Sequence, residues 1–399
     1  MTHANTHVKG FSFAVATAGI KQSEHPDCGL IYSEVPANCA GVFTRNKVVA
    51  APLQITRQRI QGGKCQAVLV NSGSANACTG TQGLETAQRN GKTLAKELGI
   101  AEDLIAVSST GVIGVQLPGE RLDAVVPQLV RERTPNQAEA VAKAIMTTDL
   151  FSKVSAAQLQ DPGQSGSILG IAKGAGMIHP NMATMLGFVV TDANVGAELL
   201  QQSLSVAVEQ SFNSITVDGD TSTNDACVLA STGQSAAHVL DASGQLVPAL
   251  YQALASVFLE LSHAIVRDAE GATRFVTVEV AGAADGDEAC RVAFAVAESP
   301  LVKTALYAAD PNWGRILAAV GRAGIEDLAI DGVSIHLDDV CIVRHGGRAP
   351  EYTEEAGQAV MDQQELAIRI DLGRGSALER VWTCDFSHEY VTINAEYRT

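Results

Sequence analysis

Closely spaced cysteines, basic residues and long apolar runs are all scarce in this chain of 399 residues. None of the eight cysteines forms a CxxC pair, which disfavours a zinc site or a thioredoxin-like motif and fits a reducing compartment. With 44 acidic and 28 basic residues the formal net charge is −16, so nonspecific nucleic-acid binding is not expected.

The sequence also lacks targeting and membrane signals. No apolar run approaches the roughly 18 residues of a membrane span. The first residues, MTHANTHVKGFSFAVATAG, do not combine a charged segment with a long apolar one, as a signal peptide would. We therefore expect a cytoplasmic protein with no membrane partner.

Several catalytic and metal-binding signatures are missing as well. Lys173-Gly-Ala-Gly is not a P-loop because Gly-Lys-Ser/Thr is absent, and neither H-E-x-x-H nor G-x-S-x-G occurs, which disfavours zinc proteases and α/β-hydrolases. The segment from Asp218 fails as an EF-hand, since Thr223 replaces the required Gly and Leu229 the required Glu. An Asx-rich turn capping a following helix is the better interpretation, and no metal is expected.

A mixed α/β fold is predicted from the alternation of short apolar runs with amphipathic segments. The chain is 46% hydrophobic with 36 glycines, which suits a globular protein of two or three domains. From about residue 275 the sequence consists mainly of predicted alternating strands. We therefore place a domain boundary near 280–300. Strands are expected at 66–70, 104–108, 186–190, 275–281, 328–337, 366–372 and 381–386, and helices at 84–98, 136–146, 195–212, 247–267 and 315–322.

The segment KGAGMIHPNMATMLGFVVTD, residues 173–192, is the most informative of the chain. Thr184 follows a small residue, Ala183, between a glycine-rich turn and an apolar run. A self-cleaving precursor would expose a new N-terminal threonine at such a place, with its own α-amine as base. The alternative is an ordinary threonine ahead of a core strand. His179 is interpreted as a turn residue more readily than as a base.

Other polar turns could line a pocket. Residues 108–114, SSTGVIG, end a predicted strand and could present N–H groups as an oxyanion hole, although an ordinary turn fits too. Residues 71–80 either line a pocket or make a tight turn. Glu270 follows a long predicted helix and could point into a site. Asn312 is a candidate helix cap and Arg315 a candidate anion ligand.

Together, and in this order, eight segments resemble the ornithine acetyltransferase family of arginine biosynthesis, and the resemblance spans essentially the whole chain. These segments are 41–47, 71–80, 109–114, 173–192, 211–225, 266–273, 310–315 and 390–399. The resemblance implies a layered αββα sandwich similar to N-terminal-nucleophile hydrolases but connected differently. It also implies a catalytic domain over residues 1–280 and a smaller α+β domain over 281–399, whose tail returns to the active site.

The resemblance further implies autocatalytic cleavage between Ala183 and Thr184. The products would be an α chain of residues 1–183 and a β chain of residues 184–399, assembled as α₂β₂ or larger. Thr184 would be the nucleophile, with Thr110 and Gly111 as the oxyanion hole and Glu270 as a further catalytic residue. The implied substrate-binding residues are Thr147, Lys173, Thr184, Glu270, Asn394 and Thr399.

The implied reaction moves the acetyl group of N²-acetyl-L-ornithine to L-glutamate by a ping-pong mechanism. We expect Lys173 to bind the α-carboxylate that both substrates share, and Glu270 to handle an amine or a proton. No cofactor is expected, and the resemblance leaves open whether acetyl-CoA is a second acetyl donor.

Two alternatives remain at this point. An N-terminal-threonine aminopeptidase or amidase of related fold would pass the acyl group to water. A small-ligand binding protein without catalytic activity would never be cleaved.

Overall fold

The computed structural model describes residues 7–159, 166–179, 185–237, 239–240, 244 and 247–396. The chain forms two compact units. The first contains Met1–Met177, Asn181–Asn213 and Thr221–Ile265, and the second contains Ile178–Pro180, Ser214–Asp220 and Val266–Thr399. The expected boundary after residue 280 falls inside a strand, β9 (Phe275–Ala283), that pairs along both edges within the second unit, which therefore begins earlier.

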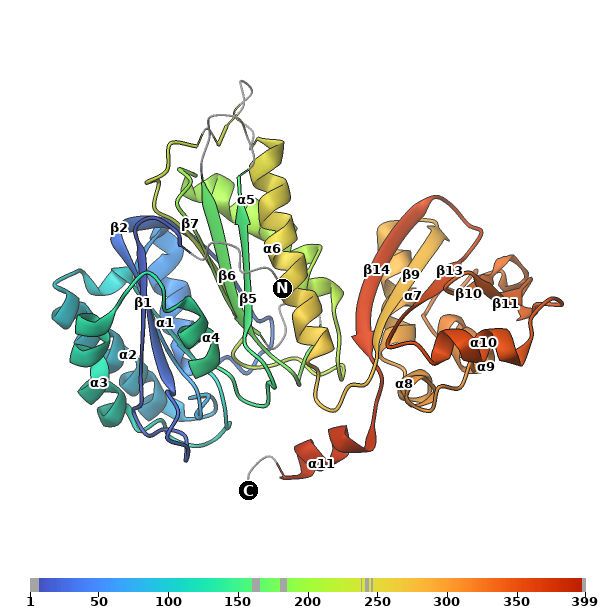
Figure 1. The fold of residues 1–399 in the computed structure, drawn as a ribbon, viewed down its shortest axis with the longest axis horizontal. Coiled ribbons are helices and arrows are strands. Elements are labelled where there is room, and N and C mark those ends of the chain that lie inside the picture. Colours follow the sequence, from blue (N-terminus) through green and yellow to red (C-terminus); the bar gives the residue numbers. More distant parts are fainter. Residues whose placement is uncertain are drawn as a thin grey trace. The chain divides into compact units, whose positions relative to one another are not determined.

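The first unit is built on an eight-stranded mixed sheet of order β4-β3-β2-β8-β7-β6-β5, and β1 pairs with the first part of β2, whereas β8 pairs with its last part (Figure 1). Pairs β3–β4 and β7–β8 are parallel and the others are antiparallel. The strands are β1 (Phe11–Ala16), β2 (Cys28–Phe43), β3 (Lys64–Asn71), β4 (Ile105–Ser109), β5 (Lys153–Gln158), β6 (Ser167–Lys173), β7 (Leu186–Thr191) and β8 (Ala226–Ser231).

Helices cover the outer faces of this sheet (Figure 1). Side chains alternate along each strand, so neighbouring residues belong to different layers. Ala14 and Leu30 join a core with α2 and α3, whereas their neighbours Phe13 and Ile31 join a second core that also contains Ile171 of β6. The helices of this unit are α1 (Ala51–Arg59), α2 (Gly80–Leu98), α3 (Gly119–Glu132), α4 (Ala138–Ala144), α5 (Ala197–Glu209) and α6 (Pro248–Arg267), the last ending in the second unit.

On the other half of the sheet, Val257 and Leu261 of α6 lie against Gly170 of β6. The second core therefore lies between two sheet layers with helices outside both, which confirms the expected α/β class. By length and composition α6 could cross a membrane, but Phe258 is buried and Val257 and Leu261 lie against Gly170, so the apolar side of α6 packs on the sheet.

The second unit has a six-stranded sheet of order β12-β11-β10-β13-β9-β14, in which only β9 and β13 pair in parallel. Its core consists almost entirely of Val, Ala, Ile and Leu. Its strands besides β9 are β10 (Ser334–Leu337), β11 (Val340–Arg344), β12 (Gly347–Arg348), β13 (Glu365–Asp371) and β14 (Ala377–Cys384). Its helices are α7 (Gly286–Ala297), α8 (Pro300–Tyr307), α9 (Trp313–Gly321), α10 (Glu354–Met361) and α11 (His388–Glu396).

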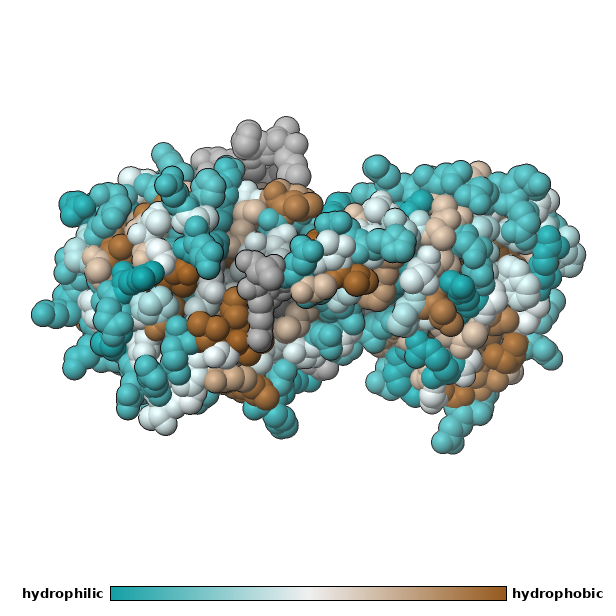
Figure 2. Space-filling model, turned by 90° about the horizontal axis from the view of Figure 1, so that it is seen from below, coloured by the Kyte–Doolittle hydropathy of each residue, from teal (hydrophilic) through white to brown (hydrophobic). Residues whose placement is uncertain are grey.

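The face of the molecule in Figure 2 is mostly polar, with separate small apolar areas, in keeping with the acidic composition. Most expected elements are present, and their ends are shifted by a few residues. Two expectations were wrong in detail: the strand expected at 328–337 is confined to β10, and residues 218–225 lead into strand β8, not into a helix. The turn they form is nevertheless rich in Asx contacts, as Asp218 Oδ1 accepts from Asp220 N.

Candidate active site

The start of β7 is where the sequence places the nucleophile. Thr184, together with Ala183, lies outside the described residues, but the strand begins two positions later at Leu186. Leu186 pairs with Lys173, the last residue of β6, and with Ala226, the first residue of β8. The register therefore brings the end of β6 and the start of β8 to the strand end that Thr184 precedes.

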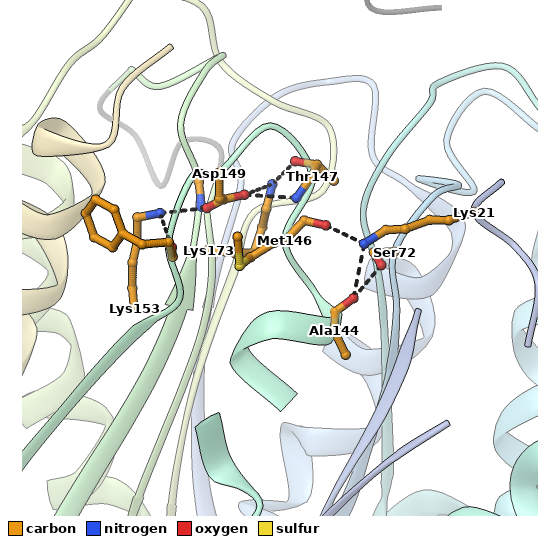
Figure 3. A network of polar contacts seen from close by, with 10 residues as sticks. Lys21, Ser72, Ala144, Met146, Thr147, Asp149, Lys153 and Lys173 are labelled. Carbon is orange, nitrogen blue, oxygen red and sulfur yellow. Dashed lines mark hydrogen bonds and ion pairs between the residues drawn. The ribbon is translucent and has the colours of Figure 1, made fainter. Parts of the chain in front are cut away.

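Lys173 is buried at this strand end, and its Nζ donates a 2.8 Å hydrogen bond to Thr147 Oγ1 (Figure 3). The structure thus brings together two of the substrate-binding residues that the sequence predicts. Thr147 lies in the loop after α4, where Asp149 Oδ2 accepts from its backbone N–H at 2.9 Å.

Asp149 is a buried carboxylate of this site that sequence reasoning missed. It lies 2.7 Å from Lys153 Nζ and 3.9 Å from Lys173 Nζ. Burial alone would raise the pKa of Asp149, but the charges of Lys173 and Lys153 outweigh it and hold the pKa well below its ordinary value. The carboxylate therefore stays ionised. Asp149 could have been suspected from the i, i+4 spacing of Asp149 and Lys153, although this spacing normally marks an exposed helical pair.

The turn at the end of β4 contains Thr110 and Gly111. The Thr110 N–H donates to Asn71 O at 3.0 Å, so this backbone group is not free for an oxyanion, contrary to what the strand-end pattern suggested. Within the described ranges, neither the Thr110 hydroxyl nor the Gly111 N–H has a hydrogen-bond partner. These two donors are the ones that the turn can offer to a developing negative charge.

Only glycine fits at position 111. Its φ is +125°, and a Cβ there would lie 2.4 Å from the carbonyl carbon of Gly73 and 2.7 Å from Ser74 N. The turn is therefore packed directly against the backbone of the 73–74 segment, which also bridges to Thr110 through Ser74. The polar segment 71–80 thus supports the candidate oxyanion turn.

Asn224 ties this turn to the start of β8. Its Nδ2 donates to Ala75 O at 2.6 Å and to Ser109 O at 2.8 Å, and all these groups are buried. Because Ala226 of β8 pairs with Leu186 of β7, the Thr110–Gly111 turn lies at the same end of the sheet as the start of β7. Sequence reasoning did not single out Asn224, because nothing in an Asx-rich turn indicates which amide will be buried.

In the second unit, Glu270 and Asn394 are brought together. Asn394, on α11, donates from Nδ2 to Glu270 Oε2 at 2.7 Å. The adjoining residues are also tied to the C-terminal segment, since Ser387 Oγ donates to Gly271 O at 2.6 Å. Glu270 is only 7% exposed, and across the described part of the chain no lysine or arginine forms an ion pair with it. Thr399 lies outside the described residues.

His179 and Arg315 have structural partners. His179 Nδ1 contacts Glu298, and its ring packs edge-on against Phe294, which favours the interpretation as a turn residue. Asn312 caps α9 as expected, with Oδ1 accepting from Arg315 N. The Arg315 guanidinium donates to Leu301 O at 2.8 Å.

In the first unit, the fold and the polar groups near the start of β7 define an α/β protein with a polar candidate site at one end of its central strands. The ArgJ family profile matches residues 12–399. An arginine biosynthesis bifunctional protein ArgJ from Syntrophotalea carbinolica is 51% identical over 393 residues, 98% of this chain and 99% of the relative. This chain therefore belongs to the ArgJ family.

Two solved structures are also similar. A chain of the arginine biosynthesis bifunctional protein argJ from Bacillus halodurans is 39% identical and matches with a TM-score of 0.50, covering 54% of this chain and 100% of that chain. A chain of the ornithine acetyltransferase from Mycobacterium tuberculosis, complexed with ornithine, is 34% identical with a TM-score of 0.38, covering 46% of this chain and 97% of that chain.

Proposed function

We propose that this protein is the acetyltransferase of arginine biosynthesis that moves the acetyl group of N²-acetyl-L-ornithine to L-glutamate. Membership of the ArgJ family over nearly the whole chain supports the reaction. The main structural support for the site is the pairing of Lys173 with Leu186, which puts a buried lysine beside the strand that Thr184 precedes. Localisation in the cytoplasm follows from the same biosynthetic role.

The proposal includes self-cleavage between Ala183 and Thr184. Thr184 Oγ attacks the carbonyl carbon of Ala183, the peptide C–N bond breaks as an ester forms, and water then hydrolyses the ester. The products are the Ala183 carboxylate and a threonine with a free α-amine.

The sheet topology supports continued association of the two products. Strands β7 and β8, from the proposed β chain, lie between β2 and β6, from the proposed α chain. Backbone ladders join β2 to β8 and β6 to β7, so separating the chains would break the sheet in two places. We extend the proposal to an α₂β₂ or larger assembly on the family resemblance alone.

Acetyl transfer then proceeds in two halves. The α-amine of Thr184 takes the proton of its own hydroxyl while Oγ attacks the acetyl carbonyl, and the Thr110 hydroxyl and Gly111 N–H stabilise the oxyanion. The C–N bond to ornithine breaks, and ornithine leaves with the proton. The α-amine of glutamate next attacks the acetyl ester, and N-acetylglutamate leaves as Thr184 regains its proton.

Both substrates carry an α-carboxylate, for which the Lys173 ammonium is the natural partner. Thr147, hydrogen-bonded to Lys173, is proposed to contact the same group. Glu270 and Asn394 are assigned to substrate binding by the resemblance, with Glu270 facing an amine or taking part in proton transfer. The resemblance also assigns Thr399 to the substrate.

We further propose acetyl-CoA as a second acetyl donor, with no bound cofactor. The term "bifunctional" in the names of the relatives supports a second activity. Incubation with acetyl-CoA and glutamate, without acetylornithine, should then produce N-acetylglutamate. Absence of product would restrict the enzyme to the ornithine reaction.

The experiment that tests the function is an initial-rate study with N²-acetyl-L-ornithine and L-glutamate. Ornithine and N-acetylglutamate should form in equal amounts, and double-reciprocal plots should give parallel lines. Intersecting lines would contradict the ping-pong mechanism. Release of acetate at a rate independent of glutamate would instead identify an amidase or aminopeptidase, which uses water as acceptor.

A further inference from the structure

One buried carboxylate holds both segments that carry the predicted ligands of the substrate carboxylate. Asp149 Oδ1 accepts from Gly174 N at 2.7 Å, and Oδ2 accepts from Thr147 N at 2.9 Å. Gly174 directly follows Lys173 at the end of β6, and Thr147 lies in the loop after α4 (Figure 3). Asp149 therefore fixes the position of Thr147 relative to Lys173.

The same loop is braced on its other side by Lys21. Its Nζ donates to Met146 O at 2.6 Å (Figure 3). The backbone before Thr147 and the backbone after Lys173 are thus both held by charged side chains, which limits their freedom before a ligand arrives.

Two lysines approach Asp149, but at different distances. Lys153 Nζ lies 2.7 Å from Oδ1, and both side chains are almost completely buried, at 0% and 1% exposure. Lys173 Nζ lies 3.9 Å from Oδ2 and makes its short hydrogen bond to Thr147 instead. Because the attraction weakens with distance and depends on direct hydrogen bonding, Lys153 is the main counter-ion of Asp149.

This division of partners has a consequence for Lys173. With Asp149 neutralised by Lys153, the three groups carry one net positive charge, and it resides on Lys173. If Lys153 were uncharged, the buried Asp149 would need another cation, and the nearest one is Lys173 at 3.9 Å. Lys173 would then be drawn toward Asp149 and away from a ligand.

We propose that Asp149 and Lys153 are positioning residues of this enzyme: Lys153 neutralises Asp149 so that Lys173 remains available for the α-carboxylate shared by acetylornithine and glutamate. The inference rests on the proposed function, since it concerns how that substrate is bound. Neither residue touches the reacting atoms in this account. Their effect is on the affinity for both substrates, through the charge and position of Lys173.

The test uses Lys153→Met, which keeps an unbranched side chain one atom shorter and removes its charge. The double variant Asp149→Asn/Lys153→Met removes both charges. The matched control is Lys143→Met, which removes the lysine of the exposed Glu139–Lys143 pair at the same i, i+4 spacing. For each variant, KM for both substrates, kcat and the thermal midpoint would be measured on the full-length enzyme.

Lys153→Met should raise KM for both substrates by about tenfold or more, since a charged hydrogen bond to the carboxylate is weakened. Its kcat should change less than KM. The double variant should recover most of the loss in KM, because Lys173 is no longer drawn to a charged Asp149, and Lys143→Met should match the wild type. If Asp149 and Lys153 had a purely structural role, the effects of the two substitutions on KM would add, and the double variant would show no recovery.

Unchanged KM in a folded Lys153→Met enzyme would overturn the proposal, as would a double variant with KM raised as much as in the single one. If Lys153→Met does not fold, the double variant decides alone by comparison with Lys173→Ala: a lower KM supports the proposal and an equal KM overturns it. Failure of the wild type to transfer acetyl would overturn the proposed function instead. The dissociation constant for L-glutamate, measured by calorimetry in the same variants, would then still test Lys153.

Discussion

Asp149 and Glu270 are both buried carboxylates, one in each unit, but their surroundings differ. Asp149 has two lysines within 4 Å and accepts two backbone N–H bonds. Glu270 accepts from the amide of Asn394, and no lysine or arginine among the described residues forms an ion pair with it. The charge of Asp149 is compensated by lysines, whereas the described residues offer Glu270 no cation.

This difference indicates two uses of a buried charge. A carboxylate paired within the fold holds neighbouring groups in place, and removing its partner leaves a costly unpaired charge. A carboxylate without a cation is suited to an incoming amine, or to a proton, because a ligand can supply the missing positive charge. We therefore expect variants of Asp149 to affect stability and positioning, and variants of Glu270 to affect turnover and substrate binding.

The largest effect is expected from Thr184→Ala, which leaves both carboxylates in place. If Asp149 and Glu270 only assist a reaction that Thr184 carries out, this variant should be an uncut chain of 41.7 kDa without transfer activity. A denaturing gel and the acetyl-transfer assay check both points. A cut or active Thr184→Ala protein would show that Thr184 is not the nucleophile and that another residue carries out the reaction.

Gly111→Ala should lower kcat by about 10² to 10³, the usual effect of losing one oxyanion donor. A Cβ at position 111 would overlap the backbone of Gly73, so the turn must move. Gly114→Ala is the control, because Gly114 also has a positive φ, +83°, but a Cβ there meets nothing within 4 Å. Equal losses in the two variants would argue against a specific role for the turn.

Glu270→Gln keeps the shape of the side chain and removes its charge. Turnover should fall by about tenfold to a hundredfold, since a charged hydrogen bond to an amine is worth about 1.5–3 kcal/mol, while the thermal midpoint should change little. Glu279→Gln, in the partly exposed pair with Arg380, is the control for the same unit. If Glu270→Gln has the same kcat and KM as the wild type, Glu270 has no role in turnover or substrate binding, and the proposed difference from Asp149 is wrong.

The last prediction concerns stability and its pH dependence, where the smallest effect on turnover is expected. Asp149 has a lowered folded-state pKa, so its contribution is complete above the ordinary aspartate pKa of about 3.9 and is lost as the pH falls below it. Asp149→Asn should lower the free energy of unfolding by about 3–5 kcal/mol near pH 7. The difference from the wild type should shrink below about pH 4. Urea unfolding between pH 3 and 7 measures it, and a difference that does not vary with pH would contradict the assignment.

The helices and buried strands with clear periodicity could be predicted from the sequence. The interval 84–98 lies within α2, and the predicted strand 66–70 lies within β3. The long strand β2 could not be predicted from the sequence, because its 16 residues include glycine, proline and polar side chains. They form a strand only through pairing with β1, β3 and β8.

Within the site, the resemblance predicts Thr147, Lys173, Thr110 and Gly111 as functional residues, and the structure brings the first two into contact. Asp149, Lys153 and Asn224 were not predicted, and the spacing of Asp149 and Lys153 alone does not indicate a buried pair. Their roles depend on contacts that only the tertiary fold creates, such as the bond from Asn224 to Ser109 across 115 positions. The assignments of Thr184 and Thr399, which lie outside the described residues, remain predictions.

The most direct test of the account is a denatured mass spectrum of the purified protein before and after incubation with N²-acetyl-L-ornithine alone. The account predicts two chains, residues 1–183 and 184–399, with one acetyl group added to the second chain after incubation. Addition of L-glutamate should remove that acetyl group. A single chain of 41.7 kDa, or two chains without acetyl on residues 184–399, would contradict a threonine nucleophile exposed by self-cleavage.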